Sequence, residues 1–143
     1  LLDKWFGNAD RLHIDSWVEI NYVDGYKVSL LSKKNISKNK LFFINLGGYD
    51  ENKFEELHES EFLVGDKKIE IKKRAKETLM KGLDQVHTDD LYDVDDCIEI
   101  NKVSDYFINL KKEKNKSESL KFNNGYHPIP KKIIEKYKSL INN

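Results

Sequence analysis

The fold is decided by a stretch that occurs twice, as WVEINYVDGYKVSL at residues 17–30 and as CIEINKVSDYFINL at residues 97–110. Glutamate, isoleucine, asparagine, valine, tyrosine and leucine recur at matched places, and the offset between the two stretches is 80 residues. Similarity at a fixed period is typical of proteins built from repeated supersecondary units. We therefore expect a tandem repeat of roughly 80 residues.

The match continues on both sides of the duplicated stretch. Upstream, His13-Ile14-Asp15 matches His87-Thr88-Asp89 at an offset of 74 residues, so the second copy has extra residues within the acidic stretch 90–96. Downstream, residues 41–49 have a weaker echo at residues 120–126. The chain then divides into the rear part of a first repeat with its front missing, a complete second repeat, and a partial third-repeat strand with a C-terminal helix, at residues 1–39, 40–119 and 120–143.

Each repeat has the pattern of two strands, a helix and a hairpin, which predicts an α+β fold of mainly antiparallel sheet with a packed helix. The apolar residues 40–46 precede Gly47-Gly48, a pattern that predicts a buried strand ending in a tight turn. Residues 60–64 predict a second, short strand.

The predicted helix begins with Asp66 as its cap and runs to about Lys81, where Gly82 ends it. Its apolar face has the spacing i, i+4, i+8 and consists of Ile71, Ala75 and Leu79.

Turn and cap signals place the remaining elements. Asp24-Gly25 between two alternating runs is the strongest short signal for a β-hairpin, and Ser104-Asp105 occupies the same place in the second copy. Pro130 suits the first position of a last helix. Cys97 is expected in the core, and Trp17 is expected in the core of the first repeat, partly exposed if an upstream piece is missing.

Composition limits the classes of function. Lysine plus arginine equals aspartate plus glutamate at 25 each, so the net charge is zero and a general electrostatic grip on nucleic acid or on an anionic membrane is not expected. The single cysteine excludes an internal disulfide and suits a reducing, cytoplasmic compartment. The chain opens without methionine in what the repeat register makes the middle of a helix, so we expect the natural protein to begin further upstream.

Three strings carry a resemblance to a known family. LFFINLGGY at residues 41–49, FEELH at residues 54–58, and His87-Thr88-Asp89 followed by Val94-Asp95-Asp96 resemble the bacterial domain-of-unknown-function family numbered 1543. The resemblance covers about residues 41–100 and the rear of an earlier copy. It implies a bacterial, cytoplasmic protein with tandem repeats, and it implies no activity.

The sharpest group of candidate binding residues combines histidine with carboxylate, which can bind a divalent metal or transfer protons. The pairing is used twice, and Tyr49 follows the double glycine close by; the candidates are His58, Glu59, His87, Asp89, His13, Asp15 and Tyr49. Reuse in two copies favours a structural role, in which the aspartate caps a turn and the histidine fills a half-buried polar position.

A metal site remains an alternative. Aspartates crowd the stretch before the second duplicated segment, and oxygen-rich loops suit calcium or magnesium. The ligands of such a site would be His58, His87, Asp89, Asp93 and Asp95. The sequence contains no complete calcium-loop or phosphate-loop pattern, and it requires no cofactor.

Three functions stay open at this point. The favoured one is a non-enzymatic binding or interaction module, since no convergent catalytic set is visible and the repeat offers sheet edges or a groove. The second is a small metal-assisted enzyme that uses the His/Asp group, and the third is an inhibitor or immunity-type protein. Either a homodimer or an upstream segment of the same chain is expected to cover the strand edge or apolar face that the missing front leaves open, and a protein partner is a separate candidate.

Overall fold

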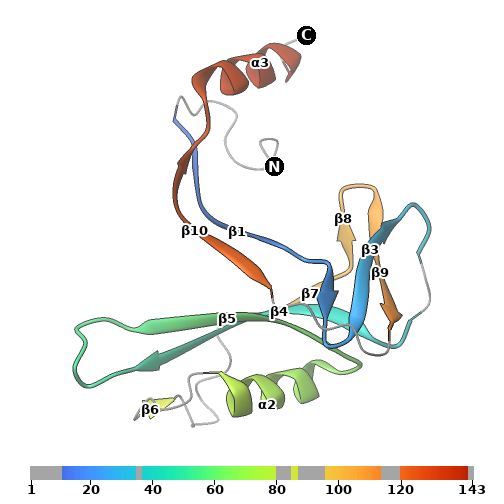
Figure 1. The fold of residues 1–143 in the computed structure, drawn as a ribbon, viewed down its shortest axis with the longest axis vertical. Coiled ribbons are helices and arrows are strands. Elements are labelled where there is room, and N and C mark those ends of the chain that lie inside the picture. Colours follow the sequence, from blue (N-terminus) through green and yellow to red (C-terminus); the bar gives the residue numbers. More distant parts are fainter. Residues whose placement is uncertain (1–10, 35–36, 80–84, 87–95, 114–119, 142–143) are drawn as a thin grey trace. The chain divides into compact units, whose positions relative to one another are not determined.

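The structure is a computed structural model that describes residues 11–34, 37–79, 85–86, 96–113 and 120–141 (Figure 1). It is an α+β protein with mainly antiparallel sheets and a C-terminal helix, as the sequence predicts. Two compact units divide the chain. Unit 1 combines both ends, Leu1–Glu19 and Leu120–Asn143, and unit 2 is Ile20–Ser119.

Unit 2 is organised around one long strand, β4 (Lys40–Tyr49). β5 (Leu57–Gly65) pairs with β4 along one edge, while β7 (Asp96–Ile100) and the short β6 (Gln85–Val86) pair with it along the other. Alternate β4 side chains enter the core, because successive residues of a strand point to opposite faces. The buried core cluster consists of Phe42, Ile44, Leu46, Leu63, Ile71, Ala75, Leu79 and Cys97.

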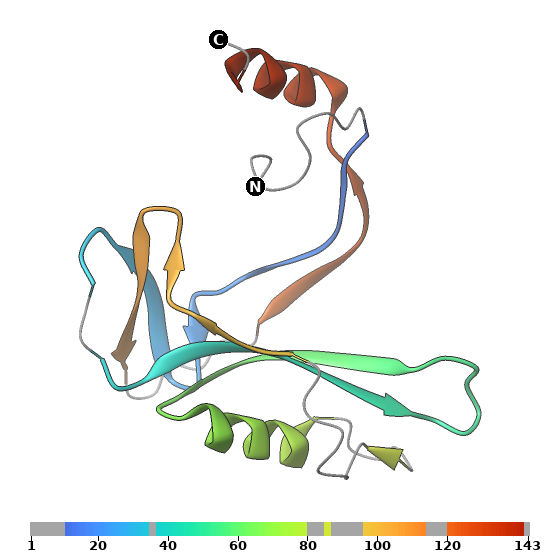
Figure 2. The ribbon, with the colours of Figure 1, turned by 180° about the vertical axis from the view of Figure 1, so that it is seen from behind.

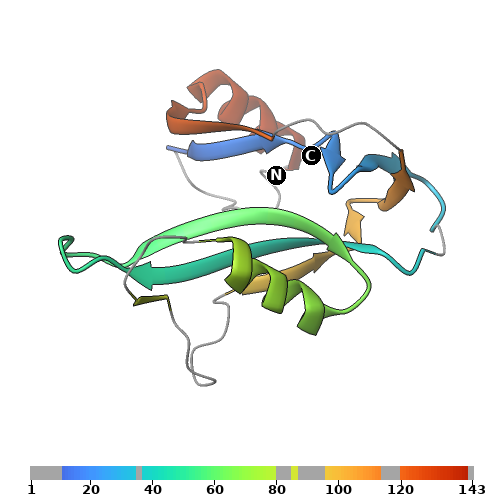
Figure 3. The ribbon, with the colours of Figure 1, turned by 60° about the horizontal axis from the view of Figure 1, so that its bottom comes forward.

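Helix α2 (Lys68–Thr78) covers this face of the sheet (Figure 3). Ile71, Ala75 and Leu79 are buried, so the predicted apolar face is confirmed. The predicted cap is wrong: Lys67 is the N-cap residue, and no side chain caps the helix. The helix is stabilised instead by the interaction of its dipole with Glu70 in the first turn and Lys76 in the last turn. Gly82, expected to end the helix, lies outside the described residues.

The predicted tight turn at Gly47-Gly48 is also wrong, because β4 continues through both glycines. Gly47 lies opposite His58, and Gly48 lies between Leu57 and Val86, so the neighbouring strands hold this part of β4 extended. The chain turns later, at Asp50, whose carboxylate accepts a hydrogen bond from the backbone N–H of Asn52 at 3.0 Å. That hydrogen bond lowers the pKa of Asp50.

Two hairpins form a second sheet in unit 2, with strand order β2-β3-β9-β8 (Figure 2). The strands are β2 (Tyr22–Val23), β3 (Tyr26–Leu31), β8 (Lys102–Val103) and β9 (Tyr106–Lys112). The first turn is the predicted one: Asp24 and Gly25 have φ of 52° and 75°. Two successive left-handed residues define the turn that matches the twist of paired strands. Ser104 adopts nearly the same φ, 51°, in the second turn.

The register of this sheet maps onto itself when the hairpins are exchanged. Val28 lies opposite Leu110, and Leu30 lies opposite Ile108. Adding 80 to residues 28 and 30 gives 108 and 110, so exchanging the two hairpins turns each of these pairs into the other. At the centre, the side-chain amide of Asn109 donates a hydrogen bond to Ser29 Oγ at 3.0 Å. The two hairpins are therefore related by a local twofold axis beside this pair.

Unit 1 contains a two-stranded ribbon and a helix. β1 (His13–Glu19) pairs with β10 (Lys121–Pro128), and α3 (Lys131–Ile141) follows directly. The predicted C-terminal helix is present and begins at Lys131, one residue after the predicted first position, Pro130. The ribbon contains a bulge, because Asp15 faces two residues of β10, Gly125 and Tyr126. Gly125 has φ of 138°, a conformation that favours glycine.

The tip of the β2–β3 hairpin is fastened to β5 and α2 by one carboxylate. Asp24 Oδ2 accepts a hydrogen bond from the backbone N–H of Val64 at 2.6 Å and forms an ion pair with Arg74 on α2. Glu61 on β5 lies in the same electrostatic environment. Burial, and then the charge of Asp24, raise the pKa of Glu61 above its usual value of 4.5.

Replacing Ile44 by alanine tests the core around β4. Ile44 is fully buried, so Ile44→Ala should lower the free energy of unfolding by about 2–5 kcal/mol. Ile98 on the adjacent strand is 50% exposed, and Ile98→Ala should cost about 1 kcal/mol or less. Urea unfolding measures both variants. Equal losses would mean that β4 does not form the centre of the core.

Replacing Glu61 by glutamine tests the charge environment at the hairpin tip. A raised pKa means that the folded state binds the proton more tightly, so the wild type loses stability as pH rises through and above 4.5. Glu61→Gln should therefore stabilise the protein at pH 7 and have a smaller effect near pH 4. Glu99, whose pKa is lowered by a hydrogen bond from Lys40, is the matched control: Glu99→Gln should destabilise at pH 7. Urea unfolding at both pH values checks the two signs, and a destabilising Glu61→Gln at pH 7 would contradict the prediction.

Candidate binding surface

One face of the β1–β10 ribbon presents polar and aromatic side chains to solvent. His13, Asp15 and Trp17 share this face of β1, because they alternate with Ile14 and Val18, which are half-buried on the other face. His13 Nε2 lies 3.2 Å from Asp15 Oδ1, so these two side chains, paired in the sequence pattern, also lie together in the structure.

The bulge brings Tyr126 of β10 onto this face. Its ring lies 4.7 Å from the ring of His13, centroid to centroid, in a tilted arrangement. Trp17 is 51% exposed and Tyr126 70% exposed. We name the surface formed by His13, Asp15, Trp17 and Tyr126 the His13 face. Exposed aromatic side chains of this kind supply contact area at low entropic cost when a partner covers them.

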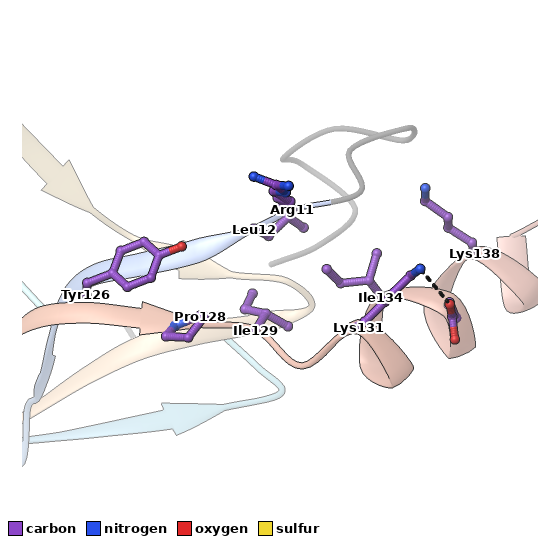
Figure 4. A pocket seen from close by; sticks show the side chains of 9 residues that line it. Arg11, Leu12, Tyr126, Pro128, Ile129, Lys131, Ile134 and Lys138 are labelled. Carbon is purple, nitrogen blue, oxygen red and sulfur yellow. Dashed lines mark ion pairs between the residues drawn. The ribbon is translucent and has the colours of Figure 1, made fainter.

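A cavity of about 660 Å³ lies in the same unit, between the ends of β1 and β10 and helix α3 (Figure 4). Tyr126 lies at one end and Lys138 at the other, with Leu12 and Ile129 between them. Three of its lining side chains are cationic, and Glu135 is the one carboxylate, 3.9 Å from Lys131 Nζ. The lining therefore combines apolar side chains with an excess of positive charge.

The candidates on β4 and β5 lie in unit 2. His58 is on β5 opposite Gly47, and its Nε2 lies 3.9 Å from Glu56 Oε2. Glu59 follows His58 on the strand, so the two side chains point to opposite faces of the sheet. Tyr49 is the last residue of β4 and is half-exposed. The structure therefore does not bring His58 and Glu59 to one face.

Four other candidates, His87, Asp89, Asp93 and Asp95, lie outside the described residues. Within the described part of the chain, no group of three or more His, Cys, Asp and Glu side chains is arranged to hold a metal ion. Cys97 is buried opposite Ile44 in the core, as the sequence predicts. Across the same described ranges, no helix is long and apolar enough to cross a membrane.

A second cavity, of about 380 Å³, lies in unit 2 between β7, β9 and the start of β4. Its rim carries an ion pair, Lys40 Nζ to Glu99 Oε2 at 2.8 Å, and the hydrogen bond from Lys40 lowers the pKa of Glu99. Apolar side chains of Leu41, Ile100 and Phe107 line its interior. Sequence reasoning missed this cavity, because the start of β4 lies more than 50 residues before β7 and β9 in the chain.

Sequence reasoning also missed the contact of Tyr126 with His13 and the ion pair between Asp24 and Arg74. Trp17 was expected in a core or partly exposed, and the structure places it half-exposed on the His13 face. The contact of Tyr126 with His13 arises from the pairing of β10 with β1, which joins residues more than 100 positions apart.

The pairing of β10 differs from that of β4. Between Leu41 and Asn45, β4 has a neighbour on both edges, β5 and β7. Among the described residues, β10 has a neighbour on one edge only, β1. An unpaired strand edge presents backbone donors and acceptors to any additional strand. We call this the β10 edge.

Comparison with known proteins places the chain in a family of unassigned function. No curated protein matches the sequence. Among solved structures, the crystal structure of a protein Il1583 from Idiomarina loihiensis is similar, with 23% identity and a TM-score of 0.59 over 90% of this chain and 72% of that chain. At this identity the likeness shows the fold alone. The profile of the family described as Domain of Unknown Function (DUF1543) matches residues 1–30 and 53–110, more than half of the sequence, so the chain belongs to the DUF1543 family.

Proposed function

We propose that this protein is a non-enzymatic interaction module whose β10 edge accepts an additional β-strand from a polypeptide partner. The observation that carries the proposal is the one-sided pairing of β10 beside the two-sided pairing of β4. Strand addition supplies main-chain hydrogen bonds for affinity and side-chain contacts on alternate residues for specificity.

The His13 face supplies such side-chain contacts. Trp17 lies directly opposite Asn123 of β10, and Tyr126 stacks on His13 close to the bulge. Both aromatic rings are at least half-exposed, so a partner strand that adds to β10 has apolar area within reach. Burial of such area contributes roughly 25 cal/mol per Å² before the costs of association are subtracted.

We also propose that the chain is built from tandem copies. The registers of the two hairpins support this, as does a matching pair of hydrogen bonds: the N–H of Val28 donates to Asn21 O at 2.8 Å, and the N–H of Ile108 donates to Asn101 O at 3.0 Å. The two stretches matched by the family profile end at Leu30 and Leu110, which is the same offset. In this interpretation 1–39, 40–119 and 120–143 are the rear of one copy, a whole copy and the start of a third.

A bacterial cell and a reducing cytoplasm are the proposed setting. The single cysteine supports the compartment, because the described structure buries its side chain rather than exposing it to a redox partner. The inhibitor or immunity-type function is compatible with strand addition, since a partner enzyme or toxin would then supply the strand.

Hydrogen exchange tests the β10 edge. Successive amides of an antiparallel strand point to opposite edges, so alternate amides between Phe122 and His127 should exchange fast, whereas the amides of Leu41–Asn45 in β4 should all exchange slowly. A strand-forming peptide of residues 57–65 should slow the fast β10 set roughly tenfold or more at saturation. The same peptide with its sequence reversed is the control. Uniformly slow exchange of β10 in the free protein would contradict the proposal.

Native mass spectrometry tests the metal-assisted alternative. The protein should appear at its bare mass, with no divalent-metal surplus that a chelator removes. His58→Ala should change the mass only by the substitution itself and should leave the unfolding temperature in chelator unchanged. His58 is exposed, and its pairing with Glu56 is a long surface contact of 3.9 Å, which contributes little to stability. A stoichiometric surplus in the wild type that is lost both with chelator and in His58→Ala would favour the enzyme.

A further inference from the structure

We propose that the cavity of about 380 Å³ in unit 2 binds a small organic monoanion, in which a carboxylate is joined to an apolar body. We call this cavity the Lys40 pocket; Lys40 and Glu99 lie at its rim, and Leu41, Ile100 and Leu110 line its interior. The proposal does not rest on strand addition to β10, because none of the described residues that line the pocket belongs to β10.

The pocket lies where the chain crosses twice between the two sheets of unit 2. Lys40 begins β4 after the connection from β3, and Asn101 leads from β7 into β8. Leu41 lies opposite Ile100 in the β4–β7 pair, so both crossings leave the sheet at the same place. The N–H of Ile108 donates to Asn101 O at 3.0 Å, which holds the second crossing against β9. β9 therefore supplies the third wall of the pocket.

The interior of the pocket is apolar. Leu41 and Leu110 are 2% and 8% exposed, and Ile100, Phe107 and Ile108 are half-buried. Sites for small molecules in proteins have volumes of about 300–1,000 Å³ and mostly apolar linings with a few polar groups. A volume of about 380 Å³ is near the lower end of this range, so the Lys40 pocket suits a small ligand with an apolar body.

The rim of the pocket has an excess of one positive charge. Among the described residues that line it, Lys34 and Lys40 are cationic and Glu99 is anionic. Lys40 Nζ lies 2.8 Å from Glu99 Oε2. The pKa of Glu99 is lowered, chiefly by this hydrogen bond and in addition by the charge of Lys34, so Lys34 acts on the same carboxylate. Two cations therefore surround one carboxylate, and a bound monoanion balances their charge.

The ion pair leaves hydrogen-bond donors for such a ligand. An ammonium group has three N–H donors, and Lys40 gives one of them to Glu99. The connection that precedes Lys40 is fixed by two hydrogen bonds of Asn39. Its side-chain amide donates to Tyr26 Oη at 2.9 Å, and its backbone N–H donates to Ser37 Oγ at 3.2 Å. The ammonium group of Lys40 is therefore held near the pocket before a ligand binds, which lowers the entropic cost of binding.

The charged groups favour a carboxylate over a phosphate. Both cations are lysines, which act as point charges, whereas arginine supplies the fork that binds phosphate through two hydrogen bonds. A phosphate monoester has a charge of about −1.5 to −2 at pH 7, which exceeds the single positive charge available beside Glu99. The same excess of positive charge disfavours a ligand with an ammonium group.

The test is an NMR titration of the 143-residue protein at pH 7 with phenylacetate, which joins a carboxylate to one apolar ring. We expect saturable shifts of the amide signals of residues 40–41, 100–101 and 107–108, with a Kd on the order of 1 mM for a ligand of this size. Residues 57–60 should not shift, because they pair with the opposite end of β4. 2-Phenylethylamine, which has the same ring and a positive charge, should bind at least tenfold more weakly, and so should acetate, which lacks the ring.

Two matched variants locate the charge that binds the ligand. Lys34→Gln removes the excess positive charge and leaves the ion pair of Lys40 and Glu99 in place. Lys34 is exposed, so the variant should fold, and it should bind phenylacetate about threefold more weakly or worse. Lys33→Gln removes an adjacent exposed lysine that does not line the pocket, and it should bind phenylacetate as the wild type does.

Four results would overturn the proposal. They are the absence of saturable shifts at about 10 mM phenylacetate, equal binding of 2-phenylethylamine, tighter binding of phenyl phosphate, and equal losses in Lys34→Gln and Lys33→Gln. The last result would show a general effect of surface charge instead of a site. Amide exchange of β10 with a strand peptide is a separate measurement, so failure of the Lys40 pocket would leave strand addition standing.

Discussion

The two-sided pairing of β4 is the constraint on which the rest of unit 2 depends. β5 on one edge and β7 on the other pair with the backbone of β4 between Leu41 and Asn45, so the side chains of Phe42 and Ile44 can be buried together with a hydrogen-bonded backbone. The same pairing fixes which residues face α2, because a shift of one residue would turn the core side chains outward. Helix, hairpin tip and core therefore all take their positions from one strand.

Local signals in the sequence predicted the elements whose causes are local. Asp24-Gly25 specified a turn with two left-handed residues, and the spacing of Ile71, Ala75 and Leu79 specified a helix face. The predicted turn at Gly47-Gly48 is wrong because pairing with neighbouring strands overrides the local preference, and the predicted cap at Asp66 is wrong because the helix begins one residue later, with Lys67 as its N-cap. Pairing with β5 and β6 holds the two glycines in a strand, and the residues around the glycines do not predict this pairing.

The candidate site was predictable only in part, for the same reason. His13 and Asp15 lie together because they are two residues apart on one strand. Tyr126 joins them through a bulge in a strand more than 100 residues away, which sequence spacing does not reveal. Arg74 meets Asp24 across 50 residues, and its role at the hairpin tip was invisible in a helix face that otherwise reads as solvated lysine. The sequence was enough to name the candidate side chains, but only the pairing registers of the strands show which of them lie together.

The pairing of β3 with β9 also has a kinetic consequence. Its central contact joins Ser29 and Asn109, 80 residues apart, whereas β4 and β5 are joined by a short turn. Closing a longer loop costs more conformational entropy, and this cost comes before the stabilising contacts form, so non-local strand pairing slows folding. We therefore expect the β4–β5 hairpin with α2 to form first, the β3–β9 pairing to follow, and the ribbon of β1 and β10 to form last, so that folding proceeds from the middle of the chain outward.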